Sequence, residues 1–374
     1  MCQSRSERDT VSLNHGLIER FVGHERKQNR TNVIRVVGPS LAVLTLVWTF
    51  HGVDPRRVLV LVASIGGGGV LILLPQLLSL LVESFGWQLA FGTMGERLPL
   101  LGLFRARLAT EALAQTLPAG VVFCESMKPL LLARTCGAPL STSLAGMAAR
   151  KWLLVVSQSL YVGGFAVLGW SALRGISVEM TGGGGLSYAL LGAAGLLLAL
   201  DVTSYGLLAH GRVASRLFAA LSRIPSTWLR ARLSPLESRC AHTDGQMRRF
   251  FENVLRSPWP VLAFACGWLL EAAETLLILY LLGVRLPWTT IGAVEVSSRL
   301  LRNVAFMVPA GLGVQDLSYV TFFRALHLPD ALELAAAFLL LKRCKECFWA
   351  AIGYVILAFD LRPLQAPKPV EQTC

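Results

Sequence analysis

Charged side chains are scarce in this 374-residue sequence. Asp, Glu, Lys and Arg together make up 16%, whereas hydrophobic residues make up 54% and the mean hydropathy is +0.56. Soluble domains carry about 25% charged residues, so the composition argues against an ordinary soluble enzyme and against a disordered chain. The eight cysteines do not pair at short spacings, which argues against a secreted disulfide scaffold. A multi-pass membrane protein fits these figures.

Catalytic, metal-binding and export motifs are also missing. The sequence has no HExxH, GxSxG, paired DxxxD or Walker A pattern, and its six histidines are scattered without ligand spacing. Cys344 and Cys347 form a CxxC, but within an apolar run that has no second CxxC or His partner. The first 32 residues are polar and predict no cleavable signal peptide. We therefore expect no metal, no cofactor and no enzyme activity.

The charge that is present has a strong bias toward basic residues. Lys and Arg number 35 against 23 Asp and Glu, a formal net charge of +12. Residues 211–256 contain nine arginines and no lysine, and the N-terminal tail contains six basic residues before residue 31. The positive-inside rule places both segments in the cytoplasm. Most of the basic charge is therefore explained by topology, and nucleic-acid binding is not expected.

Six apolar runs are long enough to cross a bilayer as helices, which needs about 20 residues. They cover residues 33–50, 58–82, 150–170, 186–210, 259–282 and 331–359. Two further apolar stretches, 105–135 and 289–328, are interrupted in the middle by Pro118-Ala119-Gly120 and by 308–313. Pro and Gly break helices, so each stretch predicts a re-entrant pair of half-helices. The predicted fold is an all-α polytopic membrane protein with about six spans and two re-entrant hairpins.

These elements divide the chain into segments with a predicted topology. A cytoplasmic tail (1–32) precedes the first span with its outer loop (33–57), and the final cytoplasmic tail is 361–374. Between them we expect a first repeat unit (58–170), an outer loop with the fourth span (171–210), an Arg-rich cytoplasmic loop (211–258) and a second repeat unit (259–360). Both termini are then cytoplasmic.

The two units match each other at a constant offset of 191 residues. Pro118 and Gly120 correspond to Pro309 and Gly311. Acidic and basic residues follow the same offset, in the pairs Glu125 with Asp316, Glu83 with Glu274, and Lys151 with Lys342. The predicted topology gives the units opposite orientations. Inverted repeats with broken helices are the pattern of secondary transporters, although duplicated hairpins with a purely architectural role remain the alternative.

Several ionisable residues lie inside the predicted spans, where charge is costly and indicates function. Glu271 and Glu274 stand three apart on one helix face, so one of them is expected to hold a proton. Glu295, Arg299 and Arg302 form a second stripe. The alternative to a functional role is intrahelical neutralisation, between Glu295 and Arg299 and between Glu346 and Lys342. A lone Asp201 lies in the fourth span, and the Arg-rich loop allows either a topological role or contact with anionic lipid.

One segment carries a family resemblance. The run Arg302-Asn-Val-Ala-Phe-Met-Val-Pro-Ala-Gly-Leu-Gly-Val-Gln-Asp316, followed by the basic helix from Leu339, resembles the flippase-like transmembrane region of lysylphosphatidylglycerol synthases, in a stand-alone, hopanoid-associated-like branch. Ala310 stands where the family has Gly, and Asp316 where it has Glu. The resemblance implies lipid translocation without the synthase domain.

The resulting hypothesis is a polar chamber that holds a lipid headgroup while the acyl chains stay in the bilayer, with Arg299 and Arg302 binding phosphate. Membrane lipids are the expected ligands. A second copy of the chain or proteins of envelope-lipid synthesis are the other partner hypotheses. An intramembrane lipid-modifying enzyme and a non-catalytic partner of such a complex remain alternatives. The candidate lipid-binding residues are Pro118, Gly120, Glu125, Lys151, Glu271, Glu274, Arg299, Arg302, Pro309, Gly311, Gly313, Gln315, Asp316, Lys342, Arg343 and Glu346.

Overall fold

The computed structural model describes residues 52–117, 120–210, 213–222, 237–254, 256–304 and 313–360. Every regular element in these ranges is a helix, which confirms the all-α class for the described part of the chain. The predicted first span (33–50), the tails 1–32 and 361–374, and the residues Pro118, Pro309 and Gly311 lie outside the described residues.

Four of the described helical segments are long and apolar enough to cross a membrane. They are 66–93, which combines the 3₁₀ segment η2 (Gly66–Ile72) with α4 (Leu73–Thr93), then α7 (Leu140–Leu168), α9 (Gly185–His210) and α13 (Trp259–Leu281). The predicted sixth span corresponds to α16 (Ala331–Asp360), a single helix of 30 residues whose middle carries Lys342, Arg343, Lys345 and Glu346. Its length is sufficient to span a bilayer, but its charge separates it from the four apolar helices.

The second predicted span, 58–82, begins as two shorter pieces. Helix α3 (Pro55–Ser64) ends before the glycine run, and η2 carries the chain into α4, which continues to Thr93. Gly66 has a φ of +54°, a conformation that glycine adopts more readily than other residues. Four consecutive glycines weaken an α-helix, and Pro75 removes a further backbone donor. Hydropathy alone did not detect this break.

The segment predicted as an outer loop, 171–185, is instead largely helical. Helix α8 (Trp170–Thr181) follows α7 directly and ends at Gly182, whose φ is +73°. Glycine in the left-handed conformation is a common helix C-cap. The Arg-rich loop likewise contains α10 (Val213–Ser222) and α12 (Glu237–Val254).

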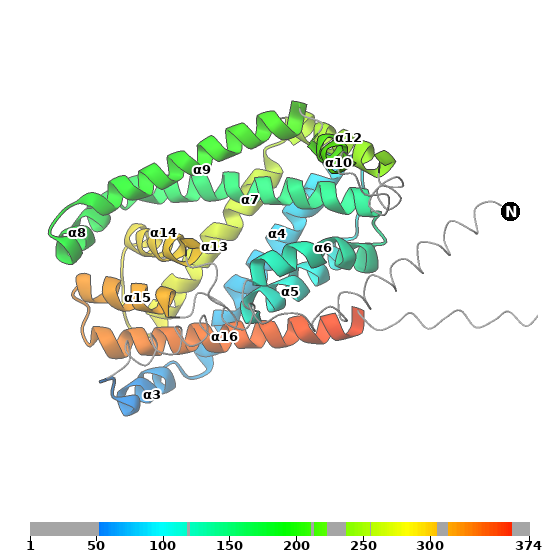
Figure 1. Ribbon diagram of the computed structural model, residues 1–374. Coiled ribbons are helices and arrows are strands. Elements are labelled where there is room, and N and C mark those ends of the chain that lie inside the picture. Colours follow the sequence, from blue (N-terminus) through cyan, green and yellow to red (C-terminus); the bar gives the residue numbers. More distant parts are fainter. Residues whose placement is uncertain are drawn as a thin grey trace, which may run out of the picture.

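The two interrupted stretches each form a pair of helices packed against each other. Helices α5 (Leu100–Thr116) and α6 (Gly120–Cys136) make the first pair, and α14 (Trp288–Val304) and α15 (Val314–Ala325) make the second. In Figure 1 the two pairs lie toward opposite ends of the molecule, between the long helices α7 and α16, while α4 and α13 cross obliquely. Each of the two interrupted stretches therefore contains two helices instead of one.

Packing between the two halves is reciprocal. Helix α5 packs on α16, which follows the second hairpin, and α14 packs on α7, which follows the first. Glycines permit both approaches: a Cβ on Gly353 would lie 2.6 Å from the Leu108 carbonyl oxygen, and one on Gly292 would overlap the Phe165 ring. Each hairpin is therefore held by the terminal helix of the other half.

The outer surface of the bundle is apolar. Large hydrophobic side chains are exposed along α4, α9 and α16, including Leu74, Leu196, Val202 and Phe348. Monomeric soluble proteins rarely expose continuous apolar surface on this scale, whereas lipid-facing helices do. The charged side chains in the middle of α16 point into the bundle, unlike the surface charges of a soluble protein. They belong to the site described next.

Candidate functional site

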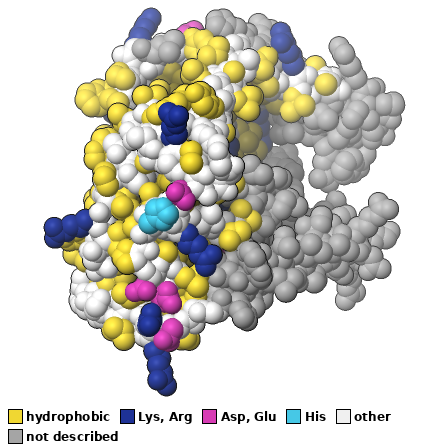
Figure 2. All heavy atoms as spheres, turned by 90° about the vertical axis from the view of Figure 1, so that its left-hand side faces the viewer, with side chains coloured by type: hydrophobic (Ala, Val, Ile, Leu, Met, Phe, Trp, Pro, Cys, Tyr) yellow, Lys and Arg dark blue, Asp and Glu magenta, His cyan; other side chains and the backbone are white. Residues whose placement is uncertain are grey.

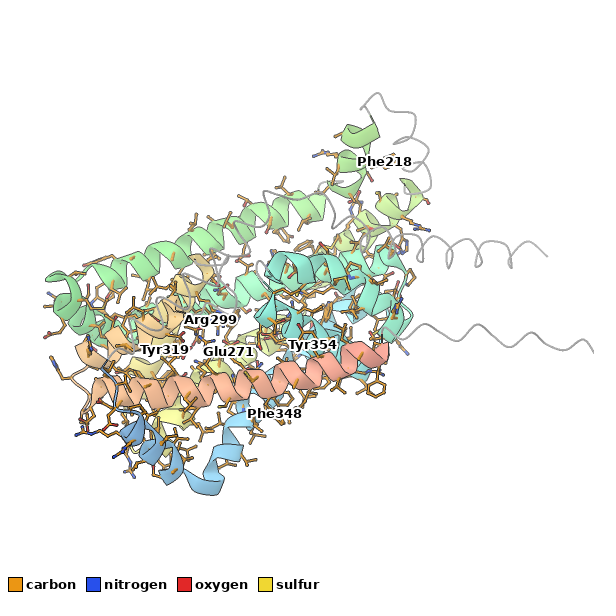
Figure 3. The ribbon with its side chains drawn as sticks, turned by 60° about the horizontal axis from the view of Figure 1, so that its bottom comes forward. Phe218, Glu271, Arg299, Tyr319, Phe348 and Tyr354 are labelled. Carbon is orange, nitrogen blue, oxygen red and sulfur yellow. The ribbon has the colours of Figure 1, made fainter. Side chains whose placement is uncertain are left out.

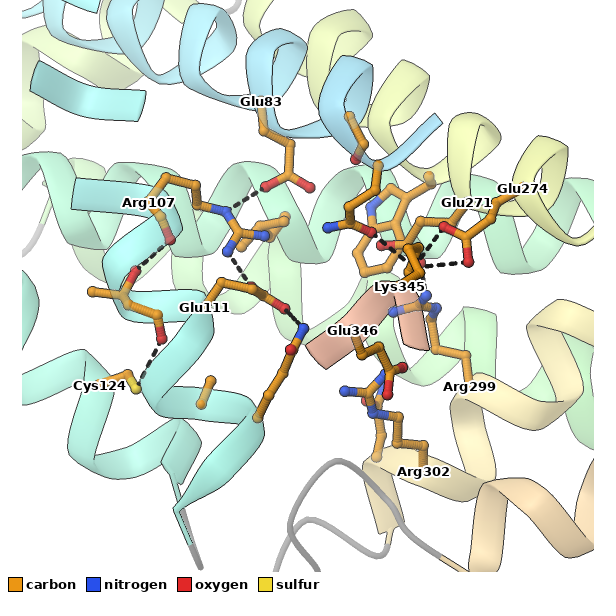
Figure 4. Close-up of a pocket in the computed structure, with 18 of the residues that line it drawn as sticks. Glu83, Arg107, Glu111, Cys124, Glu271, Glu274, Arg299, Arg302, Lys345 and Glu346 are labelled. Atoms are coloured by element: carbon orange, nitrogen blue, oxygen red, sulfur yellow. Dashed lines mark hydrogen bonds and ion pairs between the residues drawn. The ribbon is translucent and has the colours of Figure 1, made fainter. Parts of the chain in front are cut away.

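A polar cavity of about 270 Å³ lies in the middle of the bundle, between the two hairpins and against α4, α7, α13 and α16 (Figure 4). Seven basic and six acidic side chains line it. These residues are Glu83, Arg107, Glu111, Glu125, Lys128, Arg150, Glu271, Glu274, Arg299, Arg302, Lys342, Lys345 and Glu346. A cluster of this size is costly in an apolar environment unless its charges are paired, so the pairing pattern decides what the cavity can bind.

The two carboxylates of α13 each have a cation from a different helix. Glu271 pairs with Arg299 of α14, and both oxygens of Glu274 accept hydrogen bonds from Lys345 Nζ of α16, at 2.7 and 2.8 Å. Glu274 is only 2% exposed. Because each carboxylate is neutralised separately, the expected sharing of one proton between Glu271 and Glu274 has no geometric basis.

Arg299 is also held by an aromatic ring. Its guanidinium lies 4.6 Å from the Trp268 ring centroid, a distance typical of cation–π contacts. Trp268 is fixed in turn, because its indole nitrogen donates to Ser157 Oγ at 2.9 Å and its ring stacks on Tyr161. In Figure 4 the side chains of Arg299 and Glu271 point toward each other between α14 and α13.

Lys342 belongs to a buried network at the α14–α15–α16 junction. Its Nζ donates to the Tyr319 hydroxyl at 2.7 Å, to Glu295 at 3.0 Å and to Thr275 at 3.3 Å. The Tyr319 hydroxyl donates to Glu295 at 2.5 Å. Glu295 and Tyr319 are at most 2% exposed, so this network fixes the second hairpin against α13 and α16.

Arg343 connects α16 with the start of α15. It donates to Asp316 and to Glu346, both at 2.6 Å. Asp316 also accepts a hydrogen bond from the Gly313 amide at 2.8 Å, and Gly313 has a φ of +82°. The intrahelical pairs considered from the sequence do not form, because Glu295 pairs with Lys342 and Glu346 with Arg343.

The first hairpin contributes a second charged group, most of which the sequence reasoning missed. Glu83 of α4 accepts from Arg107 of α5 and from Arg150 of α7, each at 3.1 Å, and Arg107 also pairs with Glu111. Lys128 of α6 pairs with Glu125 at 2.6 Å. A signal was present: Arg107 and Glu111 are four residues apart within the predicted hairpin.

Arg302 differs from the other cations of the cavity. Among the residues that the structure describes, it is the one lining Lys or Arg with neither an ion pair nor a hydrogen bond. Glu111 and Glu346 are near enough to act on it electrostatically. These two carboxylates pair with Arg107 and Arg343 instead, so the Arg302 guanidinium donates no hydrogen bond to another described residue.

The remaining predicted residues take different places. Gln315 lines the cavity with its Oε1 lacking a hydrogen-bond partner, and Glu125 also lines it. Gly313, Asp316 and Arg343 lie behind the lining, and Gly120 begins α6. Lys151 is exposed and does not line the cavity, although its neighbour Arg150 does. Arg107, Glu111, Lys128, Arg150 and Lys345 are lining residues that the predicted set lacked.

Neither the cysteine pair nor any metal-binding cluster forms a second candidate site in the described residues. Cys344 and Cys347 are free and exposed on the outer face of α16. Within the described ranges, no group of three His, Cys, Asp or Glu side chains is arranged to hold a metal ion.

Comparison with known proteins identifies the family. A search of curated proteins found no significant match. The family model of the lysylphosphatidylglycerol synthase transmembrane region matches residues 35–341, which include both hairpins and end one residue before Lys342. The match covers most of the chain and includes every element that lines the cavity except α16 from Lys342 onward. This chain is therefore a membrane protein that belongs to the lysylphosphatidylglycerol synthase transmembrane region family.

Proposed function

We propose that the protein is a flippase-like transporter that moves an amphipathic lipid between the two leaflets of the membrane. The observation that carries the proposal is the charged cavity inside an apolar bundle, with Arg302 as its one unpaired cation among the described residues. The family relationship supports a role in lipid handling. Ionisable groups kept at this depth are expected to serve a ligand.

The charges of the cavity indicate which headgroup it accommodates. Seven cations and six carboxylates line the cavity, and Glu295, Asp316 and Arg343 complete their ion pairs from behind the lining, which brings each sign to eight. Arg302 has no ion-pair partner among the described residues, and its planar guanidinium offers two parallel hydrogen bonds to a phosphodiester. The free Oε1 of Gln315 is an acceptor for a headgroup hydroxyl or amine. Together these groups replace the water that a headgroup loses on entering the membrane.

The arrangement of the hairpins supports a transport mechanism. The reciprocal packing of α5 on α16 and of α14 on α7 is what two inverted repeats would produce, with both hairpins re-entrant and the cavity between them. Interhelical ion pairs hold the second hairpin to α13 and α16. Rocking of one hairpin against this frame would expose the headgroup site first to one leaflet and then to the other.

The distribution of arginine supports an orientation. The end of the bundle that carries α10 and α12 contains the Arg-rich segment, and the positive-inside rule places it in the cytoplasm. The C-terminal end of α16 lies toward the same end in Figure 1. We therefore infer a bacterial cytoplasmic membrane protein with both termini in the cytoplasm.

The alternative of an intramembrane enzyme finds less support. It depended on Glu271 and Glu274 as an acid–base pair, yet Arg299 and Lys345 neutralise them separately. The two carboxylates therefore contact separate cations and do not form a pair with each other. A non-catalytic role as a partner in envelope-lipid synthesis makes no use of an unpaired Arg302.

Reconstitution into liposomes tests the proposed function. Fluorescent lipids that differ in headgroup are incorporated, and a membrane-impermeant quencher reports their movement between leaflets. We expect the wild-type protein to accelerate movement of phosphodiester lipids and R302Q to lose most of this acceleration, whereas R324Q, an exposed arginine of α15, retains it. Movement no faster than in protein-free vesicles for every headgroup would refute transport. Equal rates for wild type and R302Q would refute the role of Arg302.

A further inference from the structure

A second charged surface lies outside the cavity, on α10, α12 and Arg256, which we call the arginine cap. Its exposed arginines are Arg216, Arg239, Arg248, Arg249 and Arg256, and none forms an ion pair with another described residue. Over the whole segment 211–256 the sequence has nine arginines against three acidic residues, Glu237, Asp244 and Glu252. One of these three, Asp244, accepts hydrogen bonds from within the cap.

Hydrogen bonds hold the two helices of the arginine cap together. Both oxygens of Asp244 on α12 accept hydrogen bonds from the first turn of α10: from Ala214 N at 2.9 Å, Ser215 N at 3.0 Å and Ser215 Oγ at 2.6 Å. An acidic group at a helix N-terminus satisfies donors that the helix itself cannot. Helix α10 is therefore fixed to α12 in one position.

The cap is also fixed to the bundle. Phe250 and Phe251 of α12 are completely buried and pack edge-on against Trp152 of α7. Gln246 donates to Glu96 at 2.8 Å and to Thr142 at 3.0 Å. Because one face of α12 is occupied in this way, Arg239, Arg248 and Arg249 point away from the bundle.

Helix α10 presents apolar and basic side chains together. Val213 and Leu217 are exposed, Leu217 by 61%, and Arg216 lies beside them. Only two residues separate α10 from the end of α9, a helix long and apolar enough to span the membrane. Figure 3 shows α10, marked by Phe218, extending away from the bundle. An exposed apolar stripe with an adjacent arginine next to a spanning helix is typical of a helix that lies in the membrane interface.

The opposite end of the molecule has a different surface. Figure 2 shows basic, acidic and histidine side chains scattered among apolar ones there. Its arginines are accompanied by carboxylates, as in the pairs of Arg57 with Asp54 and with Asp330. Four other arginines at that end are exposed without an ion pair to a described residue, but three exposed carboxylates, Asp54, Glu179 and Asp330, and the half-buried Glu333 lie among them. The two ends therefore differ in the excess of arginine over carboxylate, which is larger on the arginine cap.

We propose that the arginine cap binds the headgroups of anionic phospholipids in the leaflet next to it, with Val213 and Leu217 inserted at the acyl boundary. The charge complementarity selects anionic over zwitterionic lipid, and the position directly after α9 selects lipid over a soluble partner. This surface is separate from the cavity, so the inference does not depend on transport.

Hydrogen–deuterium exchange in nanodiscs tests the inference. The full chain is placed either in phosphatidylcholine alone or in phosphatidylcholine mixed with phosphatidylglycerol. We expect the anionic lipid to slow exchange in residues 213–222, an effect that weakens when salt screens the charges. In a variant with R216Q, R239Q, R248Q and R249Q we expect this lipid-dependent slowing to fall by at least about tenfold. The reason is that each arginine near the surface contributes about fivefold to the affinity for an anionic membrane.

A matched variant controls for the loss of four arginines. R56Q, R174Q, R285Q and R324Q remove four exposed arginines from the opposite end and are expected to keep the full effect in residues 213–222. Equal melting temperatures for the two variants show that the cap variant is folded. Identical exchange with and without phosphatidylglycerol would overturn the proposal, as would an equal loss in both variants. Protection of 213–222 by added envelope proteins and not by anionic lipid would also overturn it.

Discussion

The pair formed by Glu274 and Lys345 offers the sharpest test of how the cavity is held together. Glu274 Oε1 and Oε2 lie 2.8 and 2.7 Å from Lys345 Nζ, and their side chains are 2% and 7% exposed. Gln76 adds a longer contact to the same nitrogen at 3.3 Å. E274Q and K345M keep the approximate size of each side chain and remove its charge. Each single variant therefore leaves one buried charge without its partner.

The expected magnitudes follow from this burial. Removing one partner of a buried ion pair costs about 3–5 kcal/mol, whereas removing both charges is often neutral. Each single variant should lose about 3 kcal/mol, and the double variant should lose less than about 1 kcal/mol, giving a coupling near 5 kcal/mol. For a chain of this size, 1 kcal/mol corresponds to roughly 2 °C in melting temperature. The singles should melt about 6 °C lower and the double variant within about 2 °C of wild type.

Thermal melting of the purified protein in one detergent measures all four species, and an exposed pair provides the control. Arg57 and Asp330 lie 3.7 Å apart with side chains 63% and 69% exposed, so R57M and D330N should couple by less than about 1 kcal/mol. If E274Q and K345M instead lower the melting temperature additively, the two side chains do not depend on each other. The ion-pair frame proposed for the cavity would then be wrong.

Two further predictions concern packing and the arginine cap. G353A should destabilise the protein by about 1–3 kcal/mol, because the new methyl would meet the Leu108 carbonyl oxygen at 2.6 Å and push α16 away from α5. G192A, which has open space around the new methyl, should leave the melting temperature unchanged. Melting temperatures that fall equally in the two variants would contradict this prediction. D244A should remove the hydrogen bonds to the first turn of α10 at a cost of about 1 kcal/mol. Hydrogen exchange should become faster in residues 213–222 and stay unchanged in α13. Unchanged exchange in 213–222 would show that Asp244 does not hold α10.

Local sequence signals predicted the framework of helices well. Apolar runs of spanning length located α7, α9 and α13, and the Pro–Gly interruptions separated α5 from α6 and α14 from α15. These signals act within a few turns of one helix, so one sequence is enough to reveal them. The glycine run at 66–69 lies within the predicted span 58–82, but it marks the change from α3 to the 3₁₀ segment; average hydropathy does not register such a change of backbone conformation.

The charged site was predicted only in outline. Residues of the second hairpin and of α16 were predicted to belong to the site because they are charged and lie within apolar runs. Partners were predicted within each helix, whereas two of the actual pairs join different helices: Arg299 with Glu271, and Lys342 with Glu295. Glu346 does pair within α16, but with Arg343 instead of Lys342. Spacing along one helix reveals intrahelical neighbours, whereas contacts between distant segments depend on tertiary packing. For the same reason Arg150, which pairs with Glu83 of α4, was not recognised as part of the site, whereas the i,i+4 spacing of Arg107 and Glu111 was visible in the sequence.

Blocking the cavity tests most directly whether lipid crosses the membrane through it. Ala114 lines the cavity, and A114W would fill it with an indole ring, whereas A199W places the same ring on the exposed face of α9. The measurement is the rate at which a fluorescent phosphodiester lipid moves between leaflets of liposomes that contain equal amounts of each folded variant. We predict wild-type movement for A199W and the protein-free rate for A114W. Movement by A114W at the wild-type rate would contradict a path through this cavity.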